Sequence, residues 1–332
     1  MSLDAKNVKT IGLLKFKPIL RSIRWGGTRL GAFKGLSELP DDRIGESWEI
    51  SGLKGEETII AEGLFSGHTI TELLYEYGER LLGNRLYNKF GNFFPLLIKF
   101  IDAEDDLSIQ VHPGNDTAPN GHGKTELWYI IKSEPGSYIY SGFNRPVDRA
   151  KLEKFMENNR LVNVVAKHFS SSGDVFYIPA GRIHSIGAGN LLLEIQQTSG
   201  ITYRLHDYNR KDKDGKPREL HVEQALNVID YSQTDFGLAR PQLLIDYETR
   251  IKSTPYFTLS GVQIMDKVRV DVREKDSPRI IIAIQGSGKL TDSFGNTSMI
   301  HQGQTILVPA ETDFVDIKAI STPLKIITVY IE

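Results

Sequence analysis

The feature that most limits the fold of this chain is a long succession of short, β-prone segments. Apolar and β-branched stretches such as ETIIAEG, FFPLLIKFID, TELWYIIKS, SYIYSGF, GDVFYIPAG and NLLLEIQQTS are separated by Gly, Pro, Asn and Asp. The same rhythm returns towards the end, in YFTLSGVQI, RIIIAIQGSGKLTD and LKIITVYIE. Short strands joined by tight turns pack as sandwiches or jelly rolls. We therefore predict a mainly β protein.

Helical periodicity occurs in three places. A capping-box pattern at Thr69 and Glu72 precedes an apolar stripe that runs to Leu81. Similar stripes lie in residues 147–159 and 221–229. We expect three helices, each of which packs its apolar face against a sheet.

The strand rhythm breaks before the last β-rich region. We predict a metal-binding catalytic domain with helical elements in residues 1–235, a connector in 236–255 and a C-terminal jelly roll without a metal site in 256–332. A repeat links the two β regions: Gly173–Ile186 and Gly303–Ile317 share a Gly, five residues and then Pro-Ala. The alignment pairs His184 with Phe314, so a polar site is expected in only one of the two copies.

Composition excludes several classes of partner. A formal net charge of -2 gives no reason to expect nucleic acid or an anionic membrane as a partner. The chain has 0 cysteines, which excludes disulfides and thiolate ligands. No apolar run approaches the roughly 20 residues that span a bilayer, and MSLDAKNVKT lacks the apolar core of a secretion signal. We expect a cytoplasmic protein that is a monomer or a weak homodimer.

A hairpin in residues 108–131 gathers polar side chains on one face. Ser108, Gln110 and His112 alternate along the first strand, and Lys124 and Glu126 begin the second. Imidazole nitrogens with amide or carboxylate oxygens suit Zn²⁺, Mn²⁺, Fe²⁺ or Co²⁺. The alternative is that the two histidines of such a set, His112 and His184, are separate hydrogen-bonded core residues. His122, in the loop between the strands, is expected to face solvent.

The segment from Gly173 resembles the second conserved motif of the cupin superfamily. The spacing of Gly173, Pro179, Ala180, Gly181 and His184 carries this resemblance, and the 108–131 hairpin resembles the first cupin motif. The gap from His112 to Glu126 is longer than is common in cupins, which a loop insertion explains. The resemblance implies two cupin-like jelly-roll barrels, one of which holds a metal.

A second resemblance is more specific. SIQVHP, GKTELWYII, IPAGRIHSI, EIQQTSGITYRLHDYNR and GKPRELHVEQAL, with RWGGTRL and IGESWEIS upstream, resemble the type I mannose-6-phosphate isomerases, especially their short bacterial form. The resemblance implies an aldose-ketose isomerase that interconverts mannose 6-phosphate and fructose 6-phosphate through a metal-stabilised cis-enediolate. The implied cofactor is one Zn²⁺ per chain, with other divalent transition metals left open.

The same resemblance assigns residues to the site. It makes Gln110, His112, Glu126 and His184 the metal ligands, and Arg204 the active-site arginine. The positions that match the lining of the family's pocket are Trp25, Glu49, Lys99, Ser108 and Lys124. Glu49, Lys124 and an activated water are candidates for the general base. Lys99, Lys124 and Ser108 are candidate partners of the substrate phosphate.

One departure from the family pattern leaves an alternative open. The family usually has an acidic residue four positions before the arginine, where this chain has Gly200. A sugar-phosphate-binding or regulatory cupin without turnover is therefore the alternative function. An Fe²⁺ cupin dioxygenase is a further rival, but a fourth ligand in Gln110 and the charged neighbours count against it.

Overall fold

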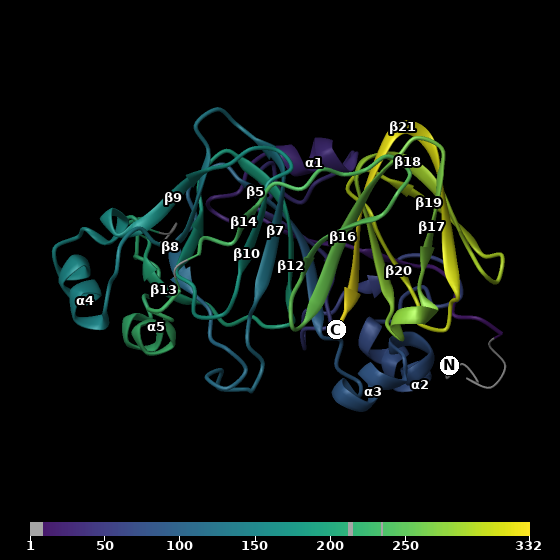
Figure 1. Cartoon of the computed structure of the whole chain (residues 1–332), viewed down its shortest axis with the longest axis horizontal. Helices are drawn as coiled ribbons and strands as arrows, with labels where there is room; N and C mark the ends of the chain where they lie inside the picture. The colour runs from purple at the N-terminus through teal and green to yellow at the C-terminus, as the bar shows by residue number, and fades with distance from the viewer. Residues whose placement is uncertain (1–8, 212–214, 234) are drawn as a thin grey trace.

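The computed structural model describes residues 9–211, 215–233 and 235–332. The described chain is mainly β with few helices, which confirms the predicted fold class. Figure 1 shows two β lobes side by side, one drawn mostly in teal and the other in green and yellow. We call the first the metal lobe, which holds the seven-stranded and five-stranded sheets, and the second the C-terminal lobe, which holds the nine-stranded sheet.

The metal lobe is built from two antiparallel sheets. The seven-stranded sheet has the order β14 (Leu238–Ala239), β10 (Val175–Ile178), β7 (Glu126–Ser133), β12 (Asn190–Gln197), β5 (Leu96–Ala103), β3 (Glu46–Ile50), β2 (Ile19–Arg21). The five-stranded sheet has the order β13 (Tyr203–His206), β6 (Ile109–Val111), β11 (His184–Ile186), β8 (Tyr138–Phe143), β9 (Val165–Phe169). Among the described residues, the first and last strands of each sheet do not pair with each other, so neither sheet closes into a barrel by itself. The site described below lies where the inner faces of these sheets meet.

The C-terminal lobe is a single sheet folded over an apolar interior. Its order is β15 (Thr249–Ser253), β16 (Phe257–Ile264), β21 (Phe314–Ile331), β18 (Arg279–Asp292), β20 (Thr305–Val308), β1 (Leu14–Lys17), β4 (Ile59–Ile60), with β17 (Lys267–Asp271) paired to β21 and β19 (Thr297–His301) paired to β18. The long strands β18 and β21 bend where their pairing shifts register, between Ala283 and Gly288. Gly286 lies in this bend with φ 79°, a conformation that favours glycine.

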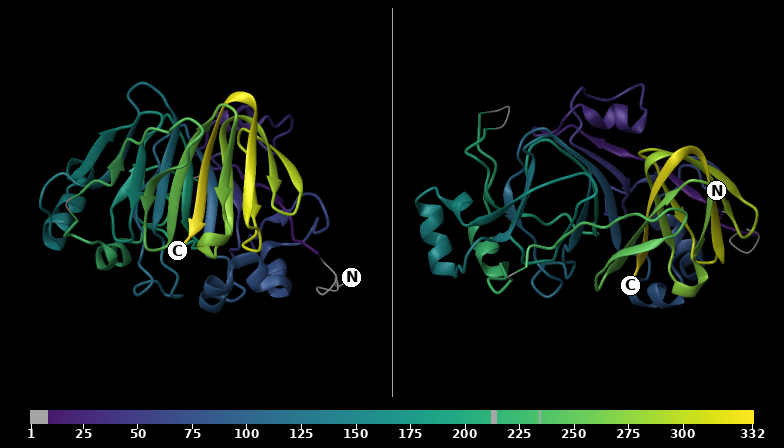
Figure 2. Two further views of the ribbon diagram at one scale, coloured as in Figure 1. Left: turned by 45° about the vertical axis from the view of Figure 1, so that its right-hand side comes forward. Right: turned by 45° about the horizontal axis from the view of Figure 1, so that its top comes forward.

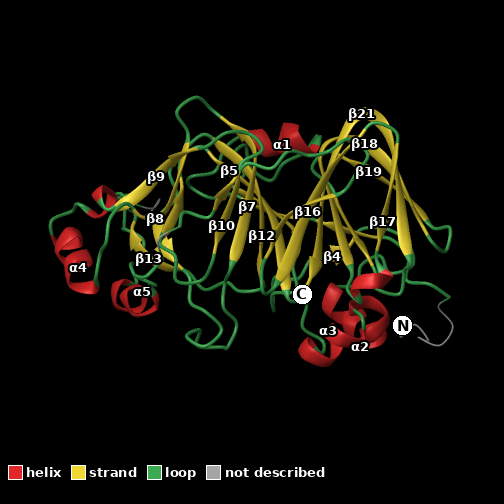
Figure 3. Ribbon diagram, viewed as in Figure 1, coloured by secondary structure: helices red, strands yellow, loops and turns green. Residues whose placement is uncertain are grey.

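The three predicted helices are present. They are α2 (Ile70–Leu82), α4 (Arg149–Glu157) and α5 (Val222–Val228). The capping box is confirmed, because the Thr69 hydroxyl accepts from the Glu72 amide at 3.1 Å and the Glu72 carboxylate accepts from the Thr69 amide at 2.7 Å. Two further helices, α1 (Arg29–Lys34) and α3 (Asn84–Phe90), and the short 3₁₀ turns η2 (Leu161–Asn163) and η3 (Arg273–Lys275) had no clear sequence signal. Figure 3 shows the helices at the ends and edges of the sheets.

The first strands of the chain connect the two lobes. Strand β1 pairs with β20 through Leu14 and Leu307, so the N-terminal segment is part of the C-terminal sheet. The purple trace in Figure 2 runs between the lobes accordingly. Within residues 236–255, β14 pairs with β10 of the metal lobe, whereas β15 pairs with β16 of the C-terminal lobe. The domain boundaries at 235 and 256 stay a prediction.

The repeat detected in the sequence forms the same local structure twice. In each copy a strand, β10 or β20, is followed by a proline turn and a second strand, β11 or β21. The turns match, because Arg182 donates to the Pro179 carbonyl and Thr312 to the Pro309 carbonyl, each at 3.1 Å. The second strands begin at the paired residues His184 and Phe314.

The described part of the chain contains no helix that is both long enough and apolar enough to cross a membrane. The prediction that the chain lacks a secretion signal rests mainly on residues 1–8, and these lie outside the described residues.

Candidate active site

Three buried residues converge between the two sheets of the metal lobe. His112 follows β6, Glu126 begins β7 and His184 begins β11, and their ligand atoms all lie within 4.8 Å of one another. The Glu126 carboxylate oxygens are 3.6 Å from Nε2 of His112 and 3.4 Å from Nε2 of His184. These residues are far apart in sequence, and strand pairing brings them together because His184 lies opposite Gln110 in the β11–β6 ladder.

The hydrogen bonds of both histidines leave one ring nitrogen facing the carboxylate. Nδ1 of His112 lies 2.9 Å from the Ile201 carbonyl, and Nδ1 of His184 lies 2.8 Å from the Arg182 carbonyl. A carbonyl accepts, so Nδ1 carries the proton in the neutral ring and Nε2 keeps its lone pair. Burial lowers the pKa of His112 and lowers the pKa of His184 to about 3. Both rings are therefore neutral, as metal ligation requires.

The Glu126 carboxylate is a buried anion that needs a cation. Burial by itself raises its pKa, but the Lys124 ammonium holds that pKa well below its usual range. Neither carboxylate oxygen accepts a well-directed hydrogen bond, although Lys124 Nζ lies 2.9 Å from Oε2. An ionised carboxylate beside two imidazole nitrogens with free lone pairs is a typical set of ligands for a divalent metal. These three residues therefore fit the implied cofactor.

Gln110 is positioned as a fourth donor. Its side-chain amide lies 3.3 Å from Nε2 of His184 and accepts a 3.1 Å hydrogen bond from the Ser108 hydroxyl. The oxygen and nitrogen of an amide exchange places by a flip, which turns the oxygen towards the histidines. Three of the four predicted ligands thus form the cluster, and the fourth is in contact with it.

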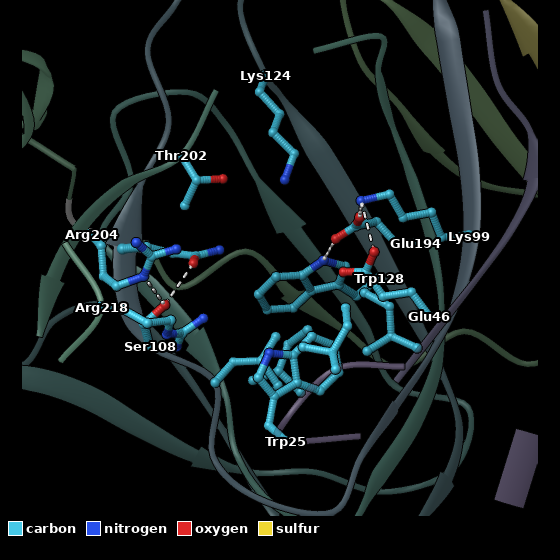
Figure 4. A pocket seen from close by; sticks show the side chains of 15 residues that line it. Trp25, Glu46, Lys99, Ser108, Lys124, Trp128, Glu194, Thr202, Arg204 and Arg218 are labelled. Atoms are coloured by element: carbon cyan, nitrogen blue, oxygen red, sulfur yellow. Dashed lines mark hydrogen bonds and ion pairs between the residues drawn. The ribbon is translucent and has the colours of Figure 1, made fainter. Parts of the chain in front are cut away.

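A cavity of about 180 Å³ opens beside this cluster. Of the residues predicted for the site, Trp25, Lys99, Ser108, Gln110, Lys124 and Arg204 line it. The other lining residues are Ile23, Glu46, Ile101, Leu107, Trp128, Ile186, Glu194, Thr202 and Arg218. Figure 4 shows charged side chains on two opposite walls, with the ring of Trp128 between them.

One wall carries a buried network of carboxylates. Lys99 Nζ lies 3.3 Å from Glu194 and 3.8 Å from Glu46. The Trp128 indole donates to the other oxygen of Glu194 at 2.9 Å, which fixes that carboxylate in place. Burial, together with the nearby Glu126, raises the pKa of Glu194. The wall therefore presents a carboxylate that takes up a proton more readily than an exposed one.

The opposite wall carries fixed guanidinium groups. Arg204 donates from Nε to the Ser108 hydroxyl at 3.3 Å and from Nη1 to the Glu219 carbonyl at 2.9 Å. The same hydroxyl reaches Gln110, so a line of hydrogen bonds runs from the metal cluster to Arg204. Arg218 lies on the same side of the pocket in Figure 4.

The prediction for Glu49 is corrected by the structure. Glu49 does not line the cavity; its carboxylate pairs with Lys34 at 2.6 Å and accepts from Ser47 at 2.6 Å, with only 5% of its side chain exposed. Glu46 faces the cavity instead. The two glutamates are three positions apart on β3, and an odd spacing places side chains on opposite faces of a strand.

Two further predictions concern loop residues. His122 is exposed, as expected, and its ring stacks on Phe93 with the ring centroids 4.4 Å apart. Gly200 is also exposed, and a Cβ there would meet Leu53 at an ordinary 3.6 Å. Its neighbours take part in the site, because Ile201 holds His112 and Thr202 lines the cavity. Gly200 is thus a place where a side chain would fit but none is present.

Sequence reasoning missed four charged or aromatic residues of the pocket, which are Glu46, Trp128, Glu194 and Arg218. A signal existed for Glu194, which is the single acidic residue within the apolar run NLLLEIQQ. Arg218 lies in GKPREL, a stretch with no apolar periodicity that would place it on a face. Its place in the cavity depends on the path of the loop between β13 and α5.

Comparison with known proteins gives a consistent result. Residues 13–137 match the family model described as the catalytic domain of type I phosphomannose isomerase. The chain is 40% identical over 221 residues to mannose-6-phosphate isomerase ManA of Bacillus subtilis, covering 65% of this chain and 68% of that protein. It is 32% identical over 290 residues to the mannose-6-phosphate isomerase of Streptococcus mutans, covering 86% and 88%. The solved structure of a mannose 6-phosphate isomerase from Bacillus subtilis superposes with a TM-score of 0.82 at 28% identity, covering 96% of this chain and 99% of that one.

Proposed function

The chain belongs to the type I mannose-6-phosphate isomerases, and from that membership we propose that it interconverts mannose 6-phosphate and fructose 6-phosphate in the cavity of the metal lobe. The observation that carries the proposal is the convergence of His112, Glu126 and His184 beside a cavity with guanidinium groups on one wall and a raised-pKa carboxylate on the other.

The reaction moves a proton between C2 and C1 and exchanges a carbonyl with a hydroxyl. Its difficult species is a cis-enediolate, whose negative charge lies on two neighbouring oxygens. Gln110, His112, Glu126 and His184 would hold a divalent metal, which would supply Lewis-acid chemistry at this end of the cavity. Arg204 adds a second, fixed positive charge, because Ser108 and the Glu219 carbonyl hold its guanidinium in one orientation.

Glu194 is the group best suited to carry the proton. It is buried on the cavity wall, its orientation is fixed by Trp128 and Lys99, and its pKa is raised. A base works best when its pKa lies near the working pH, and burial shifts the pKa of this carboxylate upwards, in that direction. It takes the place of Glu49, which faces away from the cavity.

Lys124 is better suited to donate a proton than to accept one. Burial alone lowers the pKa of Lys124, but Glu126 and Glu194 more than offset this, and the net pKa is raised. The ammonium therefore stays protonated, 2.9 Å from Glu126, and presents a hydrogen-bond donor at the edge of the metal site.

We propose zinc as the metal, one ion per chain, because two imidazoles with carboxylate and amide oxygens suit its coordination. Other divalent transition metals share these donor preferences. The chain's lack of cysteine fits a reducing compartment, so we propose that the enzyme is cytoplasmic. We also propose that it is a monomer or a weak homodimer.

A coupled assay for fructose 6-phosphate formed from mannose 6-phosphate tests the function. We expect turnover in metal-replete enzyme, loss of turnover after chelation, and recovery when zinc is returned. Absence of turnover in enzyme that holds stoichiometric metal would refute the isomerase function and favour a binding protein.

A further inference from the structure

We propose that Arg218 binds the phosphate group of the substrate and thereby selects a phosphorylated hexose over a neutral one. This inference rests on the proposed function. It assigns a protein partner to the phosphate-bearing end of the sugar, which lies away from the metal. Arg218 was not among the residues that the sequence singled out, and its place follows from the charges that line the cavity.

The two lysines of the cavity are already committed to carboxylates. Lys124 lies 2.9 Å from Glu126, and Lys99 lies 3.3 Å from Glu194. Both lysines are buried, and both glutamates are almost fully buried beside them. A phosphate dianion on that wall would face Glu46 and Glu194 at short range, which opposes its binding. The phosphate contacts predicted for Lys99 and Lys124 are therefore unfavourable.

The opposite wall has an excess of positive charge. Arg204, Arg210 and Arg218 lie around one buried carboxylate, Asp207. The nearby Glu219 side chain is 84% exposed, so water screens its charge. Burial, followed by the charge of Arg218, lowers the pKa of Arg204. Because these guanidiniums repel each other in a partly buried site, an anion bound at Arg218 lowers the electrostatic energy of this wall.

The guanidinium of Arg218 is held with one edge free. It donates from Nε to Asp207 at 2.7 Å, and its Nη2 forms a second, short bond to the same carboxylate. Among the residues that the structure describes, Nη1 of Arg218 has no hydrogen-bond partner. Arg218 lines the cavity, and 24% of its side chain is exposed. An oriented guanidinium with free donors is the geometry that binds phosphate.

The position of Arg218 suits the far end of the sugar. A line of contacts leads away from the metal cluster, from Gln110 to Ser108 and from Ser108 to Arg204. Figure 4 shows Arg204, Ser108 and Arg218 together, across the cavity from Lys99 and Glu194. A sugar whose C1 and C2 oxygens face the metal and Arg204 would extend its C6 phosphate along this wall, where Arg218 lies outside that line of contacts.

The test compares Arg218→Met with the unchanged enzyme by steady-state kinetics and by calorimetric binding of sorbitol 6-phosphate, with sorbitol as the neutral probe. Loss of a charge-assisted hydrogen bond predicts a rise of about 10- to 100-fold in KM for mannose 6-phosphate and in Kd for sorbitol 6-phosphate. We expect kcat to change much less, because the contact is made equally in the ground state and the transition state. Binding of sorbitol is expected to stay unchanged.

Two further variants separate a direct contact from a general effect of charge. Arg218→Lys keeps the charge but loses the planar fork, so we expect intermediate values of KM and Kd. Glu223→Gln removes one negative charge from an exposed residue of α5, which pairs with Arg149, and is expected to leave both constants within about two-fold, because water screens that side chain. Metal content and the unfolding midpoint show whether each variant is folded.

The outcomes distinguish this inference from the proposed function. Absence of turnover in the unchanged enzyme would count against the isomerase function, while the binding measurements would still test Arg218. An active enzyme whose Arg218→Met variant binds sorbitol 6-phosphate as tightly as before would overturn the phosphate assignment. An equal weakening of sorbitol binding would also overturn it, because the effect would then not involve phosphate.

Discussion

The interiors of the two β lobes differ in their content of charged and ligand-forming side chains. In the metal lobe the space between the sheets holds two histidines, two lysines and three glutamates, which are His112, His184, Lys99, Lys124, Glu46, Glu126 and Glu194. In the C-terminal lobe the interior is a cluster of Val, Ile, Leu and Ala that includes Val270, Val315, Ile317 and Ile326. Buried charges are tolerated only when they are paired, so each polar group of the metal lobe meets a partner from another strand. The C-terminal lobe has no such constraint and gains stability from buried apolar area.

The repeat shows how similar local structures reach these different interiors. His184 points inward, towards Glu126, but Phe314 points outward, where the guanidinium of Arg269 covers its ring at 3.6 Å. The inward residue next to Phe314 is Val315, which is fully buried. The sequence alignment thus pairs positions along the chain but not faces of the sheet. A shift of one residue in a strand exchanges inner and outer side chains, which is enough to replace a ligand by an apolar residue.

The strongest test of this comparison removes a ligand from one lobe and its aligned residue from the other. We expect His184→Ala to lose bound metal and to reduce kcat by about 10³-fold or more, since the Lewis acid contributes several kcal/mol. Phe314→Ala should keep the metal and the activity, because it lies outside the cavity. Metal analysis and the coupled assay measure both variants. An inactive His184→Ala enzyme with stoichiometric metal would contradict the ligand assignment.

A second variant separates metal binding from the fixed charge on the cavity wall. Arg204→Ala leaves the metal-binding residues in place, so we expect full metal content. Loss of a preorganised positive group is expected to lower kcat by about 10²- to 10³-fold. A variant that loses metal together with activity would show instead that Arg204 maintains the structure of the cluster, through Ser108 and Gln110.

The apolar interior of the C-terminal lobe should respond in stability rather than in chemistry. Ile317→Ala removes a fully buried side chain, and we expect the free energy of unfolding to fall by about 3 kcal/mol. KM, kcat and metal content should not change at temperatures well below the unfolding transition. Urea denaturation measures the first effect. A loss of metal in this variant would mean that the two lobes are coupled more tightly than their separate interiors suggest.

The smallest expected effect concerns an ion pair on the outer face of the C-terminal lobe. Hydrogen bonds from Arg269 and Lys267 lower the pKa of Asp316 from 3.8 to about 2. A lowered native pKa contributes stability that is complete above about pH 4 and is lost as the pH falls towards 2. We expect Asp316→Asn to lose about 0.5 to 1 kcal/mol at pH 7, since the two cations are largely exposed. The difference from the unchanged protein should narrow between pH 4 and pH 2 in urea titrations, and a difference that stays constant would exclude this ion pair as its source.

Much of the fold follows from local patterns. Short apolar and β-branched stretches bounded by Gly, Pro, Asn and Asp predicted the strands, and Thr69 with Glu72 predicted the start of α2, which the structure confirms. The spacing of His112, Glu126 and His184 in motif-like contexts predicted a metal site, and these residues meet in the structure. Such features depend on residues close in sequence, or on ligand types that serve few other purposes.

Other features depended on which strands become neighbours. The sequence by itself determined a β protein with one polar site, together with the identity of the candidate metal ligands and of Arg204. Only the tertiary structure decided that Glu46 rather than Glu49 faces the cavity, that Glu194 stands beside Lys99, and that the loop after β13 returns Arg218 to the pocket. Successive side chains of a strand point to opposite faces, and the strand's own sequence does not say which face will be buried. Long-range pairing settles that choice, because it fixes which groups of the strands and loops around the cavity meet.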